Sequence, residues 1–217
     1  MDIERARFNM VEQQIRPWEV LDTKVLDLLL KIRREDFVPE THRALAFADL
    51  EIPIGHGEKM LPPKIEARML QELAVQPDDR ILEVGTGSGY TTALLASQGA
   101  HVYSVDIVAE FTHKAGERLE HLRLRNVTLE TGDAARGWNR HGPYDVIAIT
   151  GSTPVLDDQF LHLLKPGGRL FAVVGEAPVM DARLVTCGNA NAYGTASLFE
   201  TCIPALRNAP ALPRFAF

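Results

Sequence analysis

Residues 83–90 read EVGTGSGY, and this stretch decides the fold that we expect. It directly follows the apolar pair Ile81-Leu82 and leads into a helix-sized segment that begins near Tyr90. Glycine has no β-carbon, so the backbone of such a turn can approach a ligand closely, and the first amides of the next helix add partial positive charge. The stretch therefore predicts a strand, a ligand-binding turn and a helix, in that order.

Strand-sized apolar segments recur after this turn. Together with the first they are residues 81–82, 102–105, 146–149 and 170–174. Helix-sized segments lie between the early ones, at residues 91–97 and 110–122. Strands that alternate with helices favour a mostly parallel sheet covered by helices, the doubly wound, Rossmann-like α/β architecture. Such sheets bind ligands at the carboxyl ends of their strands.

A helical extension precedes this α/β core. Apolar residues recur at helical spacing from Asp2 to Lys31, and Arg16-Pro17 interrupts them, which predicts two helices. Residues 33–57 favour extended and turn structure, and residues 63–73 favour another helix.

We therefore expect two parts within one compact unit. Residues 1–76 form an N-terminal extension with a substrate and cofactor loop, and residues 77–217 form the core with a C-terminal segment on the substrate side. The segment from Ala205 onward is rich in proline and alanine, so we expect it to run extended over the surface.

The composition excludes several classes of protein. Hydrophobic residues make up 46% of the 217 residues and charged residues 24%, which is ordinary for a globular protein and argues against disorder. Lys and Arg number 23 against 29 Asp and Glu, so the net charge is -6 and nucleic acid is not the expected partner. No apolar stretch approaches the length of a membrane span, so no membrane partner is expected either.

The cysteines and histidines give no sign of a metal site. Cys187 and Cys202 are too few and too far apart for a zinc cage or a redox pair, which favours a reducing compartment. The histidines are scattered without a carboxylate pattern that would suit zinc or iron. We expect an unanchored, cytoplasmic protein without a metal.

The spacing of the glycines separates two cofactor classes. A dinucleotide-binding turn reads G-x-G-x-x-G, which would place its third glycine at Tyr90, whereas the glycines here are Gly85, Gly87 and Gly89. With Glu83 ahead of it, the G-x-G-x-G turn resembles motif I of the S-adenosylmethionine-dependent methyltransferases. A plain tight turn is the alternative reading of the glycines, and a helix N-cap is that of Asp106.

The resemblance implies how the chain holds S-adenosylmethionine and its product S-adenosylhomocysteine. The turn lies along the methionine part, and Asp106, at the end of the second strand, accepts hydrogen bonds from the ribose hydroxyls. Asp133 resembles the superfamily aspartate that reads the adenine amino group. The cofactor residues implied in this way are Met60, Leu61, Glu83, Gly85, Thr86, Gly87, Ser88, Gly89, Asp106, Ile107, Asp133, Ala134 and Thr150.

Five further segments resemble one family within this superfamily, the protein-L-isoaspartate O-methyltransferases. They are MVEQQI at 10–15, REDFVPE at 34–40, RALAFAD at 43–49, IPIGHG at 52–57 and GDAARGW at 132–138. The similarity extends from about Met10 to Gly175. It implies methylation of the α-carboxylate of L-isoaspartyl residues, which is a protein-repair activity, and a damaged protein or peptide as the partner. We expect a monomer or a weak homodimer.

The chain departs from the family pattern at residues 58–63. The family continues with Gln-Thr-Ile-Ser-x-Pro, whereas this chain reads EKMLPP, so Lys59 replaces the threonine and Leu61 the serine. A hydrogen bond to a charged group is worth about 1.5–3 kcal/mol, so a replacement for the hydroxyls is expected. Lys59 is one candidate and His56 a second, as a donor near the methyl group. The alternatives are a solvated lysine and a structural histidine.

Three hypotheses follow. The first is an isoaspartyl methyltransferase whose carboxylate anchor has moved to Lys59, to backbone amides or to the segment around residues 199–206. The second is a methyltransferase with a different, less polar acceptor, and the third is a non-catalytic protein that binds the cofactor. The glycine spacing disfavours a dinucleotide oxidoreductase.

Overall fold

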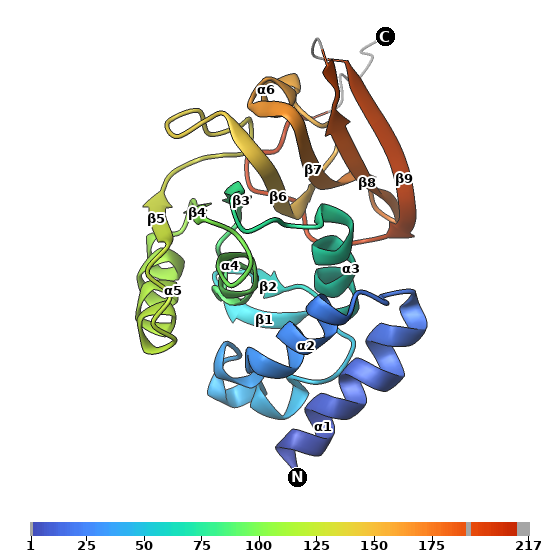
Figure 1. Cartoon of the computed structure of the whole chain (residues 1–217). Coiled ribbons are helices and arrows are strands. Elements are labelled where there is room, and N and C mark those ends of the chain that lie inside the picture. Colours follow the sequence, from blue (N-terminus) through green and yellow to red (C-terminus); the bar gives the residue numbers. More distant parts are fainter. Residues whose placement is uncertain (1, 190–191, 212–217) are drawn as a thin grey trace, which may run out of the picture.

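A seven-stranded sheet forms the centre of the molecule, with strand order β5-β4-β3-β6-β7-β8-β9. The computed structural model describes residues 2–189 and 192–211 of the chain (Figure 1). The strands are β3 (Arg80–Val84), β4 (His101–Asp106), β5 (Val127–Thr131), β6 (Tyr144–Thr153), β7 (Leu164–Glu176), β8 (Val179–Cys187) and β9 (Tyr193–Thr201).

The five strands from β3 to β7 are parallel, while β8 and β9 are antiparallel additions at one edge. From β3 the chain moves outward to β4 and β5, and it then returns to place β6 on the other side of β3. A ligand crevice is expected outside the carboxyl ends of the strands at such a reversal. Gly85, which follows β3, and Thr150, within β6, both lie at this point.

The central strands are buried on both faces, as parallel strands usually are. Along β3 and β6, successive residues alternate between two hydrophobic clusters: Ile81 and Val146 face one, and Leu82 and Ile147 face the other. The first cluster contains residues of the N-terminal extension, and the second contains Phe160 of helix α6 (Asp158–His162). The mostly parallel sheet flanked by helices confirms the predicted fold class.

Of the four helices that flank the sheet, the first three lie close to where the sequence predicts them, and the fourth was not predicted. They are α3 (Pro63–Leu73), α4 (Tyr90–Ala96), α5 (Ala109–His121) and α6 (Asp158–His162). Helix α3 begins at Pro63, because proline at the first helical position costs no hydrogen bond and its φ already suits a helix. In Figure 1, α3 and α4 lie between the sheet and the N-terminal helices, which are drawn in blue.

The N-terminal extension consists of helical turns and one hairpin. Its elements are α1 (Ile3–Met10), a π-helical turn (Val11–Ile15), a 3-10 turn (Arg16–Trp18), α2 (Thr23–Lys31), further 3-10 turns (Arg34–Asp36 and Glu40–Leu45), β1 (Ile52–Gly55) and β2 (Glu58–Met60). The predicted break at Arg16-Pro17 is confirmed. Helix α2 begins where the Asp22 carboxylate accepts a hydrogen bond from the Lys24 amide at 2.8 Å.

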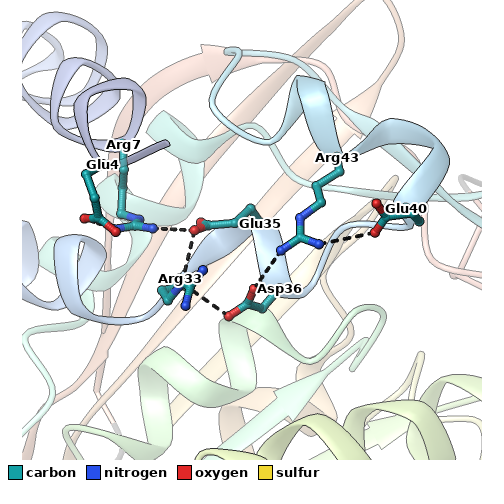
Figure 2. Close-up of polar contacts among 7 residues, drawn as sticks. All are labelled: Glu4, Arg7, Arg33, Glu35, Asp36, Glu40 and Arg43. Carbon is teal, nitrogen blue, oxygen red and sulfur yellow. Dashed lines mark hydrogen bonds and ion pairs between the residues drawn. The ribbon is translucent and has the colours of Figure 1, made fainter. Parts of the chain in front are cut away.

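A chain of ion pairs fixes the turn at Arg34–Asp36 to helix α1 (Figure 2). Arg7 and Glu35 are almost fully buried and pair with each other, and Arg33 Nε also lies 3.2 Å from Glu35 Oε1. Burial alone would raise the pKa of Glu35, but the hydrogen bonds from Arg7 and Arg33 lower it. Arg43 extends the chain at the surface, where it bridges Asp36 and Glu40.

The C-terminal part differs from the sequence prediction. The hairpin β8–β9 is an addition that the apolar pattern does not reveal. The segment from Ala205 was predicted to run extended over the surface, and Ala205, Arg207 and Asn208 are exposed; in addition, Ala205 forms a parallel bridge with Ser152 of β6. The Leu206 amide donates to the Ser152 carbonyl at 2.8 Å. Residues 212–217, the rest of that prediction, lie outside the described residues.

Among residues 2–189 and 192–211, no helix combines the length and apolar character that crossing a membrane requires. One hydrophobic cluster contains residues from both sides of the predicted boundary at residue 76, for example Leu29 and Ile81. The division into 1–76 and 77–217 stays a prediction.

Candidate active site

A cleft opens at the carboxyl ends of β3, β4 and β6. Its empty volume is about 860 Å³, including the part open to solvent. Most of the residues that the sequence singles out line it, namely Lys59, Met60, Leu61, Gly85, Thr86, Gly87, Ser88, Asp106, Ile107, Asp133, Ala134 and Thr150. Gly89, Glu83 and His56 are not among its lining residues.

The glycine turn leaves no room for β-carbons at Gly85 and Gly89. Gly85 has φ +99°, and a β-carbon there would lie 2.3 Å from Thr150 Oγ1. The Thr150 hydroxyl lies 2.9 Å from the carbonyl oxygen of Val84 and 2.7 Å from that of Gly85, to which it donates. Gly89 has φ +83° and packs against Ala115, where a β-carbon would come within 2.8 Å. The turn is therefore held open by β6 on one side and by α5 on the other.

Asp106 ends β4 and is positioned by two backbone amides. The Gly87 amide donates to Oδ2 and the Val108 amide donates to Oδ1, both at 2.9 Å. Burial raises the pKa of Asp106, and the two amides partly oppose this. Each carboxylate oxygen can accept more than one hydrogen bond, so Asp106 can bind a pair of hydroxyl groups while it supports the turn.

Asp133 lies on the loop after β5 and joins the C-terminal segment to the cleft. Its Oδ1 accepts from the Ala135 amide at 3.0 Å, and its Oδ2 accepts from Asn208 Nδ2 at 2.9 Å. Ile107 is 39% exposed and also lines the cleft, so an apolar surface is available beside Asp133 for a flat ring.

Glu83 lies beneath the cleft and not on its wall. It is fully buried, its Oε2 accepts from the Thr92 hydroxyl at 2.5 Å, and its Oε1 has no hydrogen-bond partner among the described residues. Burial raises its pKa to about 8, against the opposing hydrogen bonds of Ser104 and Thr92. Its position supports the strand end that carries the glycine turn.

The two residues proposed for catalysis are turned to other partners. Lys59, in β2, lines the cleft, but its Nζ lies 2.6 Å from Glu51 Oε2, which raises the pKa of the lysine. His56, at the tip of the β1–β2 hairpin, has its Nε2 2.6 Å from Glu110 Oε2. Glu110 also binds Lys114, and the hydrogen bonds from Lys114 and His56 lower the pKa of Glu110 to about 2.

The sequence reasoning missed a buried ion pair in the cleft wall. Glu66 of α3 lines the cleft, is fully buried, and pairs with Arg34. Arg34 also donates to the carbonyl of Leu61 at 2.5 Å and to that of Ala46 at 3.0 Å. Arg34 therefore fixes the backbone of the divergent EKMLPP segment. A signal was available, because Glu66 lies on the helix face that Leu70 and Leu73 share.

The C-terminal segment, which the first hypothesis already places on the substrate side, also supplies Arg207, a residue that the sequence reasoning did not name. Leu206 packs against Gly85 and Gly151, and Arg207 lines the cleft beside it. Arg207 Nε donates to Glu58 Oε1 at 2.6 Å, and its Nη2 donates to the carbonyl of His56. The segment thus closes one side of the cleft against the β1–β2 hairpin. No local pattern in the sequence reveals this contact.

A family model described as protein-L-isoaspartate(D-aspartate) O-methyltransferase matches residues 5–196. The chain belongs to this family. A protein-L-isoaspartate O-methyltransferase of Myxococcus xanthus is 43% identical over 156 residues, which are 72% of this chain and 74% of that protein. One from Opitutus terrae is 36% identical over 212 residues, 95% of this chain and 91% of that protein.

Solved structures of this family have the same fold. A Plasmodium falciparum protein described as such a methyltransferase, solved in complex with S-adenosyl-L-homocysteine, has a TM-score of 0.78 at 20% identity, covering 93% of this chain and 98% of that chain. Another protein-L-isoaspartate O-methyltransferase structure also has a TM-score of 0.78, at 23% identity, covering 92% of this chain and 65% of that chain. These structures support the predicted fold, and the predicted family is confirmed by the family model and the relatives.

Proposed function

We propose that this protein transfers a methyl group from S-adenosylmethionine to the α-carboxylate of L-isoaspartyl residues in damaged proteins and peptides. The observation that carries the proposal is the placement of the glycine turn, Asp106, Asp133 and Thr150 around one cleft at the reversal of the strand order. Membership of the family supports the acceptor and favours this function over another acceptor or a non-catalytic role.

The residues of the cleft fit this cofactor. The Gly85 turn would lie along its methionine part, Asp106 would bind the ribose hydroxyls, and Asp133 would bind the adenine amino group beside Ile107. When bound, the cofactor supplies an already activated, electrophilic methyl group. The protein therefore needs little acid or base chemistry of its own.

The chain's own contribution is to position the carboxylate and to exclude water. Ile54, Met60, Leu61 and Phe111 provide apolar walls for the cleft. Holding a nucleophile and an electrophile in line can lower a barrier by about 7–11 kcal/mol, and a dry site strengthens every polar contact within it. Arg34 supports this role because it fixes the Leu61 carbonyl and hence the loop that carries two of these walls.

The test is methyl transfer from labelled S-adenosylmethionine to a short peptide that contains L-isoaspartate. The matched control is the same peptide with normal aspartate, and binding of S-adenosylhomocysteine is measured in parallel. We expect transfer to the isoaspartyl peptide alone. Cofactor binding without transfer would overturn the proposed acceptor, and failure to bind the cofactor would overturn the assignment of the Gly85 turn.

We further propose that the protein acts in the cytoplasm, because both cysteines are free, with Cys187 buried and Cys202 exposed, as suits a reducing compartment. The state in solution stays a prediction, monomer or weak homodimer, which sedimentation of the purified protein would test. Lys59 and His56 also stay predictions for the catalytic step.

A further inference from the structure

We propose that Arg207 recognises the substrate carboxylate at the mouth of the cleft. This inference rests on the proposed function, since it names the residue that holds the acceptor. It addresses the divergence of the EKMLPP segment, where Lys59 and Leu61 stand in place of the hydroxyl residues of the family pattern. An anionic acceptor still needs a hydrogen-bond donor there, because moving a carboxylate out of water without such a partner costs free energy.

Arg207 is already oriented by the opposite wall of the cleft. Its Nε donates to Glu58 Oε1 at 2.6 Å and its Nη2 donates to the carbonyl of His56. Both partners belong to the β1–β2 hairpin, whereas Arg207 follows β9. No hydrogen bond from Nη1 to any described residue is found, and the side chain is 43% exposed. One nitrogen of a preorganised guanidinium is thus available for a ligand.

The charges around the cleft make a cation necessary. Four carboxylates line it, those of Glu58, Glu66, Asp106 and Asp133. Glu66 is paired with Arg34 and Glu58 with Arg207, so the negative charge of the wall comes mainly from Asp106 and Asp133. This charge suits a cationic cofactor but repels an anionic acceptor. Two cations also line it, and Lys59 is paired with Glu51, a residue outside the lining. Arg207 is held by Glu58, which lines the cleft, and by the carbonyl of His56, which does not, and its Nη1 stays available.

The geometry of a guanidinium suits this role. Arginine presents N–H groups in a planar fork that matches a carboxylate, and less side-chain freedom is lost when part of the fork is already bound. A contact through Nη1 would engage one carboxylate oxygen and leave the other with its electron pairs available for attack. Arg207 would therefore orient the acceptor without blocking the reaction.

Arg207 could instead act only as a strap that closes the C-terminal segment onto the hairpin, and the experiment separates the two roles. Binding is measured with S-adenosylhomocysteine present, for an isoaspartyl peptide and for the same peptide with isoasparagine, whose α-carboxyl group is a neutral amide. The proteins are the wild type, Arg207→Gln and Arg207→Lys. Arg183→Gln is the matched control, because Arg183 also forms one exposed ion pair through Nε, at 2.7 Å to Asp181, and lies outside the cleft.

We expect the wild type and Arg183→Gln to prefer the isoaspartyl peptide by about 10-fold or more. Arg207→Gln should lose about 10- to 100-fold in affinity for the isoaspartyl peptide and almost none for the isoasparagine peptide. The affinity of Arg207→Lys for the isoaspartyl peptide should lie between those of the wild type and Arg207→Gln. Affinity for S-adenosylhomocysteine should stay within about threefold. In methyl transfer the loss should appear in KM more than in kcat.

Two results would overturn the inference. One is an Arg207→Gln protein that keeps the wild-type preference, or that loses both peptides and the cofactor equally, as a strap would. The other is a wild type that does not distinguish the two peptides. A wild type that distinguishes them through Arg207 but transfers no methyl group would support the inference and overturn the proposed function, so the two failures are distinguishable.

Discussion

Thr150 determines the shape of the cofactor turn. Its hydroxyl occupies the space that any β-carbon on Gly85 would need, and the same hydroxyl holds the carbonyl groups at the end of β3. The turn is therefore specified twice, by the positive φ of Gly85 and by the close approach of β6. At a glycine with positive φ and open surroundings, only the backbone conformation would exclude another residue.

Gly85→Ala and Gly167→Ala separate these two effects. Gly167 has φ +81° with nothing near its missing β-carbon, so only backbone strain should destabilise that variant, by about 1–2 kcal/mol. Gly85→Ala should lose a further 1–3 kcal/mol or so from overpacking, together with most of the affinity for S-adenosylhomocysteine. Urea unfolding and calorimetric titration measure the two quantities. Equal losses in both variants would contradict the role of Thr150.

Asp106→Asn tests the ribose contact at nearly constant size. The NH2 group that replaces one carboxylate oxygen donates hydrogen bonds and accepts none, so the backbone amide and the ribose hydroxyl that this oxygen would serve lose their acceptor. Affinity for S-adenosylhomocysteine should fall by about 10- to 100-fold. Thr131→Val, near the end of the neighbouring strand β5 and outside the cleft, serves as the comparison and should bind normally.

Most of the cofactor residues that the sequence predicts line one cleft, because their order along the chain follows the strands; that they bind the cofactor stays a prediction. Gly85 and Asp133 follow a strand and Asp106 ends one, so a correct sheet brings them together without knowledge of the side chains between them. Glu83 and Arg207 show the limit of this reasoning. Whether Glu83 faces the cleft depends on the pleat of one strand, and the place of Arg207 depends on where a segment far along the chain returns.

At the scale of elements, the pair Arg34–Glu66 joins the N-terminal extension, α3 and the segment after β2. Arg34 is fully buried and reaches Glu66, the carbonyls of Ala46 and Leu61, and the face of Tyr90, whose ring centroid is 5.1 Å away. These elements line one side of the cleft. Their relative placement therefore depends on one guanidinium.

Arg34→Met should destabilise the protein by about 3–5 kcal/mol, because it leaves the Glu66 carboxylate buried without a counter-charge. The double variant Arg34→Met/Glu66→Leu should recover part of that loss. Arg43→Ala is the surface comparison in the same region (Figure 2) and should cost about 1 kcal/mol or less, since its ion pairs are exposed. Similar losses for Arg34→Met and Arg43→Ala, measured by urea unfolding, would contradict this account.

Elements with a strong apolar period were predicted, and those without one were not. Helix α3 matches the expected 63–73, because proline opens it and its apolar residues recur at helical spacing. The hairpin β8–β9 was missed because β9 lies at the sheet edge with most of its residues exposed, so its sequence has no buried face to show. The π-helical turn within residues 11–15 likewise has no signature that separates it from an α-helix.

At the scale of the whole molecule, Glu83 should make stability depend on pH. The pKa of Glu83 is about 8 in the folded protein, against an ordinary value of 4.5 that applies to the unfolded chain. Between pH 4.5 and pH 8 the folded protein therefore keeps a proton that the unfolded chain releases. The stability present below pH 4.5 is therefore lost as pH rises toward 8, by at most about 1.4 kcal/mol per pH unit. Glu83→Gln cannot ionise and should lack this slope.

The measurement is the free energy of unfolding of the cofactor-free protein, by urea, from pH 5 to pH 9. The free energy of unfolding of Glu83→Gln minus that of the wild type should increase with pH up to about pH 8 and then stay constant. Other titrating groups cancel in this difference. Parallel profiles for the two proteins would show that Glu83 stays ionised or gains a partner on folding.

Because Ala205 pairs with Ser152, one wall of the cleft can form only late in the synthesis of the chain. The glycine turn, Asp106 and Asp133 emerge from the ribosome first, but the wall formed by Leu206 and Arg207 emerges only after the sheet edge has been made. A nascent chain, or one cut short before residue 204, has every predicted cofactor residue but lacks the wall that Leu206 and Arg207 form. We therefore expect the complete cleft to form only after translation has passed residue 207.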